Sequence, residues 1–237
     1  QLRLPDMPWH GQRDRIAEAG TLLGLLTGSL GKMARDISLM AQTEVGEAAE
    51  PSAPGRGGSS TMPHKRNPVA CAAMLAAAAR VPGLVATLLA ALVQEHERAL
   101  GGWQAEWDTL PQIARLTGGA LRQMRQAVEG LEVDAARMRA NLDATHGLIM
   151  AEAVTLALGA AIGRQQAHEL VQQACEQALA SGRHLRDVLA ADDRITTMLP
   201  AAELTRLFKP GAYLGAAADF VDSVLRTHRT AHRTEQR

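Results

Sequence analysis

The chain contains few aromatic residues and few cysteines. Phe, Trp and Tyr together make up 3% of its 237 residues, so the core must be built mainly from Ala, Leu, Val, Ile and Met. Small and aliphatic side chains of this kind suit helix–helix packing better than a β-sandwich. Cys71 and Cys175 lie far apart, whereas a secreted disulfide scaffold contains many more cysteines. We therefore expect an all-α cytoplasmic protein with buried, reduced thiols.

The chain also lacks an excess of charge of either sign. It has 25 basic and 25 acidic residues and a formal net charge of zero, whereas a general nucleic-acid-binding protein carries a basic excess. No apolar run approaches the ~18 residues that a membrane span requires, because residues 70–79 are followed by Arg80. Neither nucleic acid nor a membrane is expected as a partner.

Apolar residues recur at helical spacing along most of the chain, without β alternation or internal repeats. Residues 14–42 are predicted to form a long amphipathic helix, and its glycines at 20, 24, 28 and 31 predict close approach of another helix. Two more long helices are expected at 68–98, broken or kinked at Pro82, and at 103–129, kinked near Pro111. From Leu131 the periodic segments become shorter, and we predict them at 134–142, 148–158, 164–180, 184–189, 201–207 and 213–225.

This change in segment length predicts two domains. Residues 1–130 are expected to form a central helix bundle that contains a long loop at 44–67, and residues 131–237 a small C-terminal helical domain. Residues 226–237 are polar and basic and are predicted to be a frayed tail.

The long loop has the composition of an anion-binding site. Asn67 as N-cap and Pro68 at the first helical position predict a helix start. Lys65 and Asn67 then lie at a helix N-terminus, where unpaired N–H groups and the helix dipole attract a carboxylate. Ser59 follows two glycines, and a serine can act as a base where N–H groups and a cation such as Lys65 stabilise its alkoxide.

For a generic Gly-Ser-Ser, a Gly/Ser linker before a capped helix is the better explanation. It gives no reason for Met62, Pro63, Lys65 and Asn67 to occur together with the serines. No set of His, Cys, Asp and Glu has the spacing of metal ligands, so neither a metal nor a cofactor is expected.

The stretch Gly-Gly-Ser-Ser-Thr-Met-Pro-His-Lys-Arg-Asn-Pro at residues 57–68 resembles the signature loop of the fumarase/aspartase superfamily, Gly-Ser-Ser-x-Met-Pro-x-Lys-x-Asn. Residues 8–14, 94–107 and 132–138 are similar to bacterial 3-carboxy-cis,cis-muconate cycloisomerases, and this similarity covers nearly the whole chain, thinning after about Asp193. The resemblance implies an all-α homotetramer whose active sites take residues from three chains. It also implies Ser59 and Lys65 as catalytic residues and Ser60, Met62 and Asn67 as substrate contacts.

The implied reaction joins a carboxylate of a muconate tricarboxylate to a C=C bond and yields a γ-lactone in protocatechuate (β-ketoadipate) catabolism. Such a small polycarboxylate substrate needs several cations. Arg98 is suited to bind one carboxylate bidentately, although a surface arginine paired with its glutamate neighbours is an equally simple interpretation. His10 is either a further substrate contact or only a helix-entry residue.

Lys65 and Arg98 are 33 positions apart, which is roughly 50 Å along one helix. One chain is therefore expected to supply only part of a site that neighbouring subunits complete. The superfamily has two further regions before its signature loop, and these are not found in the first 56 residues. We expect the chain to be the C-terminal portion of the enzyme and to be inactive alone.

Two alternatives remain open at this point. One is adenylosuccinate lyase or a related lyase, which shares the signature loop. The other is a catalytically silent helical oligomer.

Overall fold

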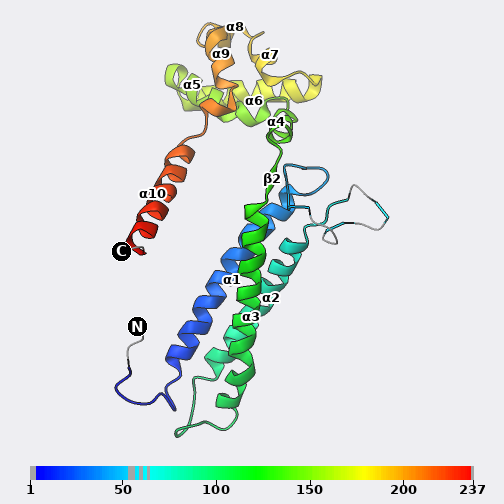
Figure 1. Ribbon diagram of the computed structural model, residues 1–237. Helices are drawn as coiled ribbons and strands as arrows, with labels where there is room; N and C mark the ends of the chain where they lie inside the picture. The colour runs from blue at the N-terminus through cyan, green and yellow to red at the C-terminus, as the bar shows by residue number, and fades with distance from the viewer. Residues whose placement is uncertain (1–3, 53–56, 59–60, 63–64, 236–237) are drawn as a thin grey trace. The chain divides into compact units, whose positions relative to one another are not determined.

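The computed structural model describes residues 4–52, 57–58, 61–62 and 65–235, and it is almost entirely helical (Figure 1). The chain divides into two compact units, Gln1–Met138 and Arg139–Arg237. The almost entirely helical structure confirms the all-α prediction. The boundary expected near Leu131 lies close to this division, and its assignment as a domain boundary stays a prediction.

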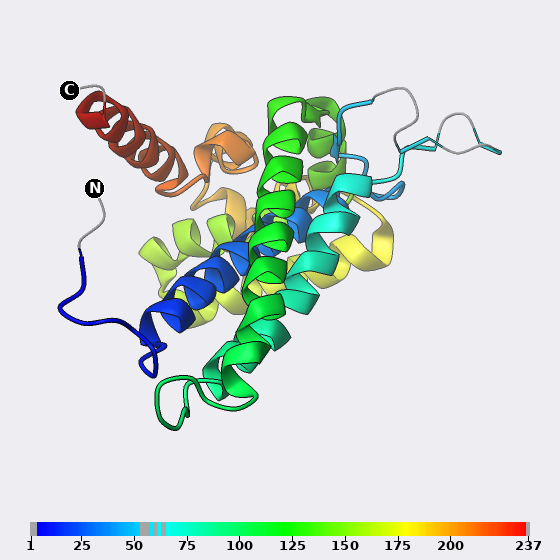
Figure 2. The ribbon, with the colours of Figure 1, turned by 60° about the horizontal axis from the view of Figure 1, so that its bottom comes forward.

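The first unit is built on three long helices, α1 (Asp14–Met40), α2 (Val69–Ala90) and α3 (Gly102–Glu129). Figures 1 and 2 show the three helices side by side along most of their length. Their shared core is aliphatic and small, as the composition predicts, and includes Leu30, Ala34, Met74, Ala77 and Met124. A buried hydrogen bond between the Thr27 and Thr117 hydroxyls, 2.7 Å long, joins α1 to α3.

Glycines on α1 allow α2 to approach closely. A Cβ atom added to Gly31 would lie 2.6 Å from the Cβ of Ala78, and one added to Gly24 would lie 2.9 Å from a methyl carbon of Val85. Gly20 is similarly close to α2. The predicted helix contact is thus confirmed at these three positions and wrong at Gly28, which has nothing within 4 Å.

The two prolines predicted to break or kink long helices lie inside continuous helices, so neither proline breaks its helix, and a kink at either position stays a prediction. Helix α2 runs through Pro82, and α3 runs through Pro111. A proline removes one N–H donor, and the packing of neighbours such as the fully buried Val81 keeps the rest of the helix in place. The predicted continuation of α2 to Arg98 is also wrong, because the helix ends at Ala90 and a loop leads to α3.

A short antiparallel ladder joins two distant segments of the first unit. Strand β1 (Ala48–Ala49) pairs with β2 (Glu132–Val133), with Ala48 opposite Val133 and Ala49 opposite Glu132. Two-residue strands are too short to show alternation in the sequence. The ladder matters because it brings the start of the long loop beside the segment that follows α3.

The second unit has a core of its own, which includes Val154, Leu158, Leu185, Leu189 and Ile195. Helix α4 (Ala135–Asp143) leads into it. The remaining elements are η1 (Leu148–Met150), α5 (Ala151–Ile162), α6 (Arg164–Ser181), α7 (Leu185–Leu189), α8 (Asp193–Thr196), α9 (Ala201–Leu207), η2 (Pro210–Ala212) and α10 (Ala217–Glu235). The predicted frayed tail is wrong as far as Glu235, because α10 continues that far.

By length and composition alone, α2 is the one helix in the described part of the chain that could cross a membrane. This corrects the expectation that no segment is long enough: Arg80 is the only charged residue between Val69 and Ala90, and one charge does not end an apolar segment. A core helix passes the same test, and α2 packs against both α1 and α3.

The glycine contacts generate a paired prediction. We expect Gly31→Ala to destabilise the chain by about 1–3 kcal/mol, because its new methyl group meets the Cβ of Ala78 and forces α1 and α2 apart. Gly28→Ala, on the same helix with open space around it, should stabilise the helix by up to ~1 kcal/mol. Urea unfolding followed by circular dichroism measures both, and equal stabilities of the two variants would contradict the proposed close contact.

Candidate active site

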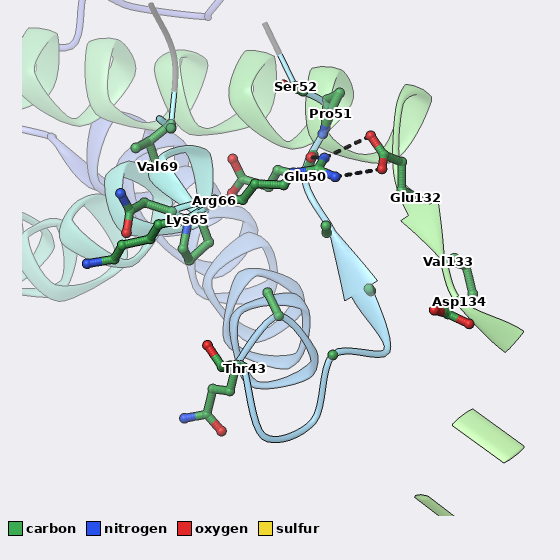
Figure 3. A pocket seen from close by; sticks show the side chains of 18 of the residues that line it. Thr43, Glu50, Pro51, Ser52, Lys65, Arg66, Val69, Glu132, Val133 and Asp134 are labelled. Atoms are coloured by element: carbon green, nitrogen blue, oxygen red, sulfur yellow. Dashed lines mark hydrogen bonds and ion pairs between the residues drawn. The ribbon is translucent and has the colours of Figure 1, made fainter. Parts of the chain in front are cut away.

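A pocket of about 1230 Å³ lies in the first unit, where β1, the start of α2 and β2 come together (Figure 3). Three predicted site residues, Met62, Lys65 and Asn67, line this pocket. Ser59 and Ser60, the predicted base and a predicted substrate contact, lie outside the described residues. The described part of the signature loop thus faces one common space.

A backbone contact closes the base of the signature loop. The backbone N–H of Asn67 donates a hydrogen bond to the backbone carbonyl oxygen of Gly57, with an N–O distance of 2.8 Å. Gly57 has φ +72°, and a Cβ there would lie 2.9 Å from the Asn67 carbonyl oxygen. A glycine is therefore required at this position both by conformation and by space.

The N-terminus of α2 is capped by Glu50. Its carboxylate accepts hydrogen bonds from the backbone N–H groups of Ala70, at 2.9 Å, and Cys71, at 2.7 Å. The Glu50 residue is 8% exposed, and its negative charge lies at the positive end of the helix dipole. The loop thus supplies its own anion to this helix.

Two sequence predictions about this helix start are wrong. The helix begins at Val69 after Pro68, with no side-chain N-cap bond from that position, so Asn67 is not the N-cap. The N–H groups of Ala70 and Cys71 are also not available to a substrate, since Glu50 already binds them. The physical reason is that hydrogen bonds from N–H groups to a carboxylate are roughly twice as strong as those to a neutral amide.

Cys71, whose backbone N–H donates to the same carboxylate, is fully buried. Burial, followed by the hydrogen bond and charge of Glu50, raises the pKa of its thiol to about 12. At neutral pH this cysteine is a neutral thiol and therefore a poor nucleophile.

Arg66 is held by two segments of the chain. Its Nη1 and Nη2 atoms donate to the two carboxylate oxygens of Glu132, at 2.7 and 2.8 Å, and Nη2 also donates to the Glu50 carbonyl oxygen. The hydrogen bond from Arg66 is the main cause that lowers the pKa of the Glu132 carboxyl. Arg66 is thus committed to partners within the chain.

The pocket contains more carboxylates than cations. Its charged lining residues are Glu44, Glu50, Lys65, Arg66, Glu132 and Asp134. Glu50 is bound to helix N–H groups, and Glu132 is bound to Arg66. Within the described residues the Lys65 ammonium makes no ion pair, and Figure 3 shows it extending away from Glu132. Among the described residues that line this pocket, Lys65 is therefore the cation that remains available to an anionic ligand.

His10 and Arg98 lie at the opposite end of the helix bundle. His10 precedes α1, and Arg98 lies in the loop between α2 and α3; both are exposed. The 22 residues of α2 separate this loop from Lys65 by about 33 Å, at 1.5 Å per residue. Within one chain, Arg98 and His10 therefore lie far from Lys65, Met62 and Asn67. This separation agrees with the expectation that neighbouring subunits share a site.

The end that carries Arg98 is internally braced. The Nε atom of Arg13 lies 3.0 Å from each carboxylate oxygen of Glu106, which is 6% exposed. Gln94 donates to Glu106 at 3.3 Å, and Arg13 also donates to the Trp9 carbonyl oxygen at 2.9 Å. These bonds fix the segment before α1 against the loop that contains Arg98.

No group of three or more His, Cys, Asp or Glu side chains suited to a metal ion occurs among the described residues. The residues that sequence reasoning missed are Glu50 and Glu132. Glu132 pairs with a residue 66 positions away, and no local pattern in the sequence signals such a contact.

Comparisons with known proteins agree with this geometry. A lyase family model matches residues 4–83, and a model of the adenylosuccinate lyase C-terminus matches residues 147–224. The chain is 58% identical to a 3-carboxy-cis,cis-muconate cycloisomerase of Bradyrhizobium diazoefficiens over 224 residues, covering 94% of this chain and 50% of the relative. It is 60% identical to the enzyme of that name from Pseudomonas putida over 204 residues, covering 86% and 48%.

A solved structure shows similarity to the same group of proteins. The crystal structure of 3-carboxy-cis,cis-muconate lactonizing enzyme from Pseudomonas putida superposes with a TM-score of 0.89 at 53% identity. The match covers 97% of this chain and 50% of that one, so the chain spans about half the length of the relatives it matches. With its signature loop, its helix bundle and these relatives, the chain belongs to the fumarase/aspartase superfamily.

Proposed function

We propose that this chain supplies one half of a cycloisomerase that converts 3-carboxy-cis,cis-muconate to a carboxymuconolactone in protocatechuate catabolism. The observation that carries the proposal is the 53–60% identity to four bacterial proteins named for this reaction. The pocket supports it, because Lys65 presents an unpaired cation and Asn67 an amide to a space large enough for a small tricarboxylate.

In the proposed reaction one substrate carboxylate oxygen attacks a carbon of the C=C bond and forms the lactone C–O bond. The π electrons move to the adjacent carbon, which then takes a proton. Ser59 is the proposed donor of that proton in the direction of lactone formation and the base in the reverse direction. Lys65 stabilises the Ser59 alkoxide that forms, and Asn67, Ser60 and Met62 orient the substrate.

The remaining cations are proposed to come from other subunits. Arg98 and His10 lie at the far end of the bundle, so in a homotetramer the end of one chain that bears Arg98 meets the pocket of another. Exposed apolar side chains along the three long helices support such an assembly; they include Leu22, Leu25, Met33, Leu89, Trp107 and Leu121. The free thiols of Cys71 and Cys175 fit the reducing cytoplasm.

The second candidate is adenylosuccinate lyase or a related lyase, which the match at residues 147–224 favours. A chimera separates the two candidates: this chain joined to the half of the Bradyrhizobium relative that it does not match. We expect the chimera to remove the ultraviolet absorbance of 3-carboxy-cis,cis-muconate and to leave adenylosuccinate intact. Cleavage of adenylosuccinate alone would favour the second candidate, and turnover of neither substrate would favour a silent helical oligomer.

Ser59 can be tested in the same chimera. We expect Ser59→Ala to lower kcat about 10²- to 10⁴-fold, the usual contribution of a positioned acid or base, with little change in KM. Ser52→Ala, at a serine that lines the pocket, should leave kcat unchanged. Steady-state rates measure both, and an unchanged rate in Ser59→Ala would make Lys65 the leading proton donor.

Site sharing predicts complementation between two inactive variants. Lys65→Ala and Arg98→Ala chimeras should each lose most activity, because each lacks a cation that the tricarboxylate needs. Tetramers reassembled from a mixture should regain activity, since some sites take Lys65 from one chain and Arg98 from the other. If the mixture stays as inactive as its components, Lys65 and Arg98 do not belong to one shared site.

A further inference from the structure

We propose that Arg66 and Glu132 are positioning residues, which hold the two ends of the signature loop together and so aim Lys65 and Asn67 into the pocket. We name Glu50, Arg66 and Glu132 the loop-base clamp. The proposal rests on the proposed function in one respect: it takes Lys65 and Asn67 to be the groups that contact substrate.

The clamp joins the two ends of the loop directly. Glu50 lies near the start of the long loop at 44–67, before the signature stretch, and Arg66 follows Lys65 at its other end. The Arg66 guanidinium binds the Glu50 carbonyl oxygen with one edge and both carboxylate oxygens of Glu132 with its fork. These three bonds determine where Arg66 lies, and its two sequence neighbours, Lys65 and Asn67, move with it.

Each partner of Arg66 is itself fixed. Glu132 lies opposite Ala49 in the β1–β2 ladder. The Glu50 carboxylate is bound to the first turn of α2 by two hydrogen bonds. Arg66 therefore links the strand ladder to the start of the helix, and Lys65 extends from this fixed point on the side away from Glu132 (Figure 3).

The charge of Glu132 argues for positioning rather than for ligand binding. A carboxylate in the wall of a pocket that takes a tricarboxylate repels the ligand. The pair also adds little to global stability, since the Arg66 and Glu132 side chains are 41% and 56% exposed and exposed ion pairs are weak. The contribution that remains is geometric: a bidentate fork holds a guanidinium in one orientation.

Neutralising Glu132 should lower kcat/KM if Glu132 positions Arg66, and should raise kcat/KM if Glu132 only repels the ligand. In the chimera we expect Glu132→Gln to lower kcat/KM on the order of ten- to hundredfold, the effect of a misplaced reactive group. Arg66→Lys should do the same, because an ammonium keeps the charge but cannot form the fork. Glu44→Gln is the matched control: it removes another carboxylate of the pocket wall whose side chain is outside the clamp, and kcat/KM should stay constant or rise.

A second readout needs no activity and uses the 237-residue chain. Cys71 is buried next to the Glu50 carboxylate. Its thiol, with a pKa raised to about 12, is unreactive while the contacts of the clamp are formed. We expect Glu132→Gln and Arg66→Lys to raise the rate at which a thiol reagent labels Cys71 by about three- to tenfold. Glu44→Gln should not change this rate, and Cys175 serves as the reference thiol in each sample.

The dependence on urea separates opening of the clamp from general unfolding. Labelling through a local opening depends little on urea below the unfolding transition, whereas labelling through global unfolding rises steeply. A faster, urea-insensitive labelling of Cys71 together with a lower kcat/KM supports the proposal.

Unchanged labelling, steeply urea-dependent labelling, or an unchanged or higher kcat/KM in Glu132→Gln each overturns it. A chimera that turns over no muconate removes the proposed function instead, and Cys71 labelling then decides by itself whether the clamp holds the loop base.

Discussion

Helix α2 acts as a rigid spacer, and the functional interpretation of the whole chain depends on its length. Lys65 and Asn67 precede its first residue, and Arg98 follows its last. The helix continues through Pro82 and packs closely against α1 at Gly24 and Gly31, so it cannot fold back to bring the two ends together. About 33 Å of helix therefore separates the groups that the proposed substrate needs at one point.

The distribution of charge in the pocket leads to the same conclusion by an independent route. A buried carboxylate must be paired or hydrogen-bonded, and Glu50 meets this need with the start of α2. The exposed carboxylate of Glu132 pairs with Arg66. These contacts build the pocket wall but consume one of its two cations. Lys65 is the one unpaired cation among the described lining residues, and it cannot alone neutralise the tricarboxylate that we propose as substrate; the proposed function therefore calls for further positive charge.

Much of the fold follows from the sequence because its signals are local. Helical periodicity predicted α1, α3 and most helices of the second unit to within a few residues, and glycine spacing predicted the approach of α2 to α1. The errors arise where a local rule competes with distant contacts. Pro82 predicted a break or a kink, and the helix is unbroken there, with Val81 fully buried beside the proline. Asn67 predicted a cap that the carboxylate of Glu50 supplies.

The candidate site shows even more clearly that local sequence patterns do not predict distant contacts. Lys65, Asn67 and Met62 were found because they belong to one continuous motif, and all three line the pocket. The partner of Arg66 was not found, because Glu132 lies 66 positions away and is brought near by a two-residue ladder. Short-range patterns predict the residues that we propose to contact a ligand, whereas the residues that hold them in place depend on the tertiary fold.

Both ends of the bundle carry a similar brace. At one end Arg66 binds Glu132, and at the other Arg13 binds Glu106, 93 positions away. In each case an arginine fork within one chain fixes a loop that bears a candidate substrate cation, Lys65 or Arg98. If the site is shared as proposed, these contacts hold the described residues of each half-site within one chain, and assembly then does not have to immobilise them; ordering loops is a main cost of forming an interface. Pre-organised half-sites of this kind are what the proposed shared site requires, because there no single chain supplies all of the groups that bind the substrate.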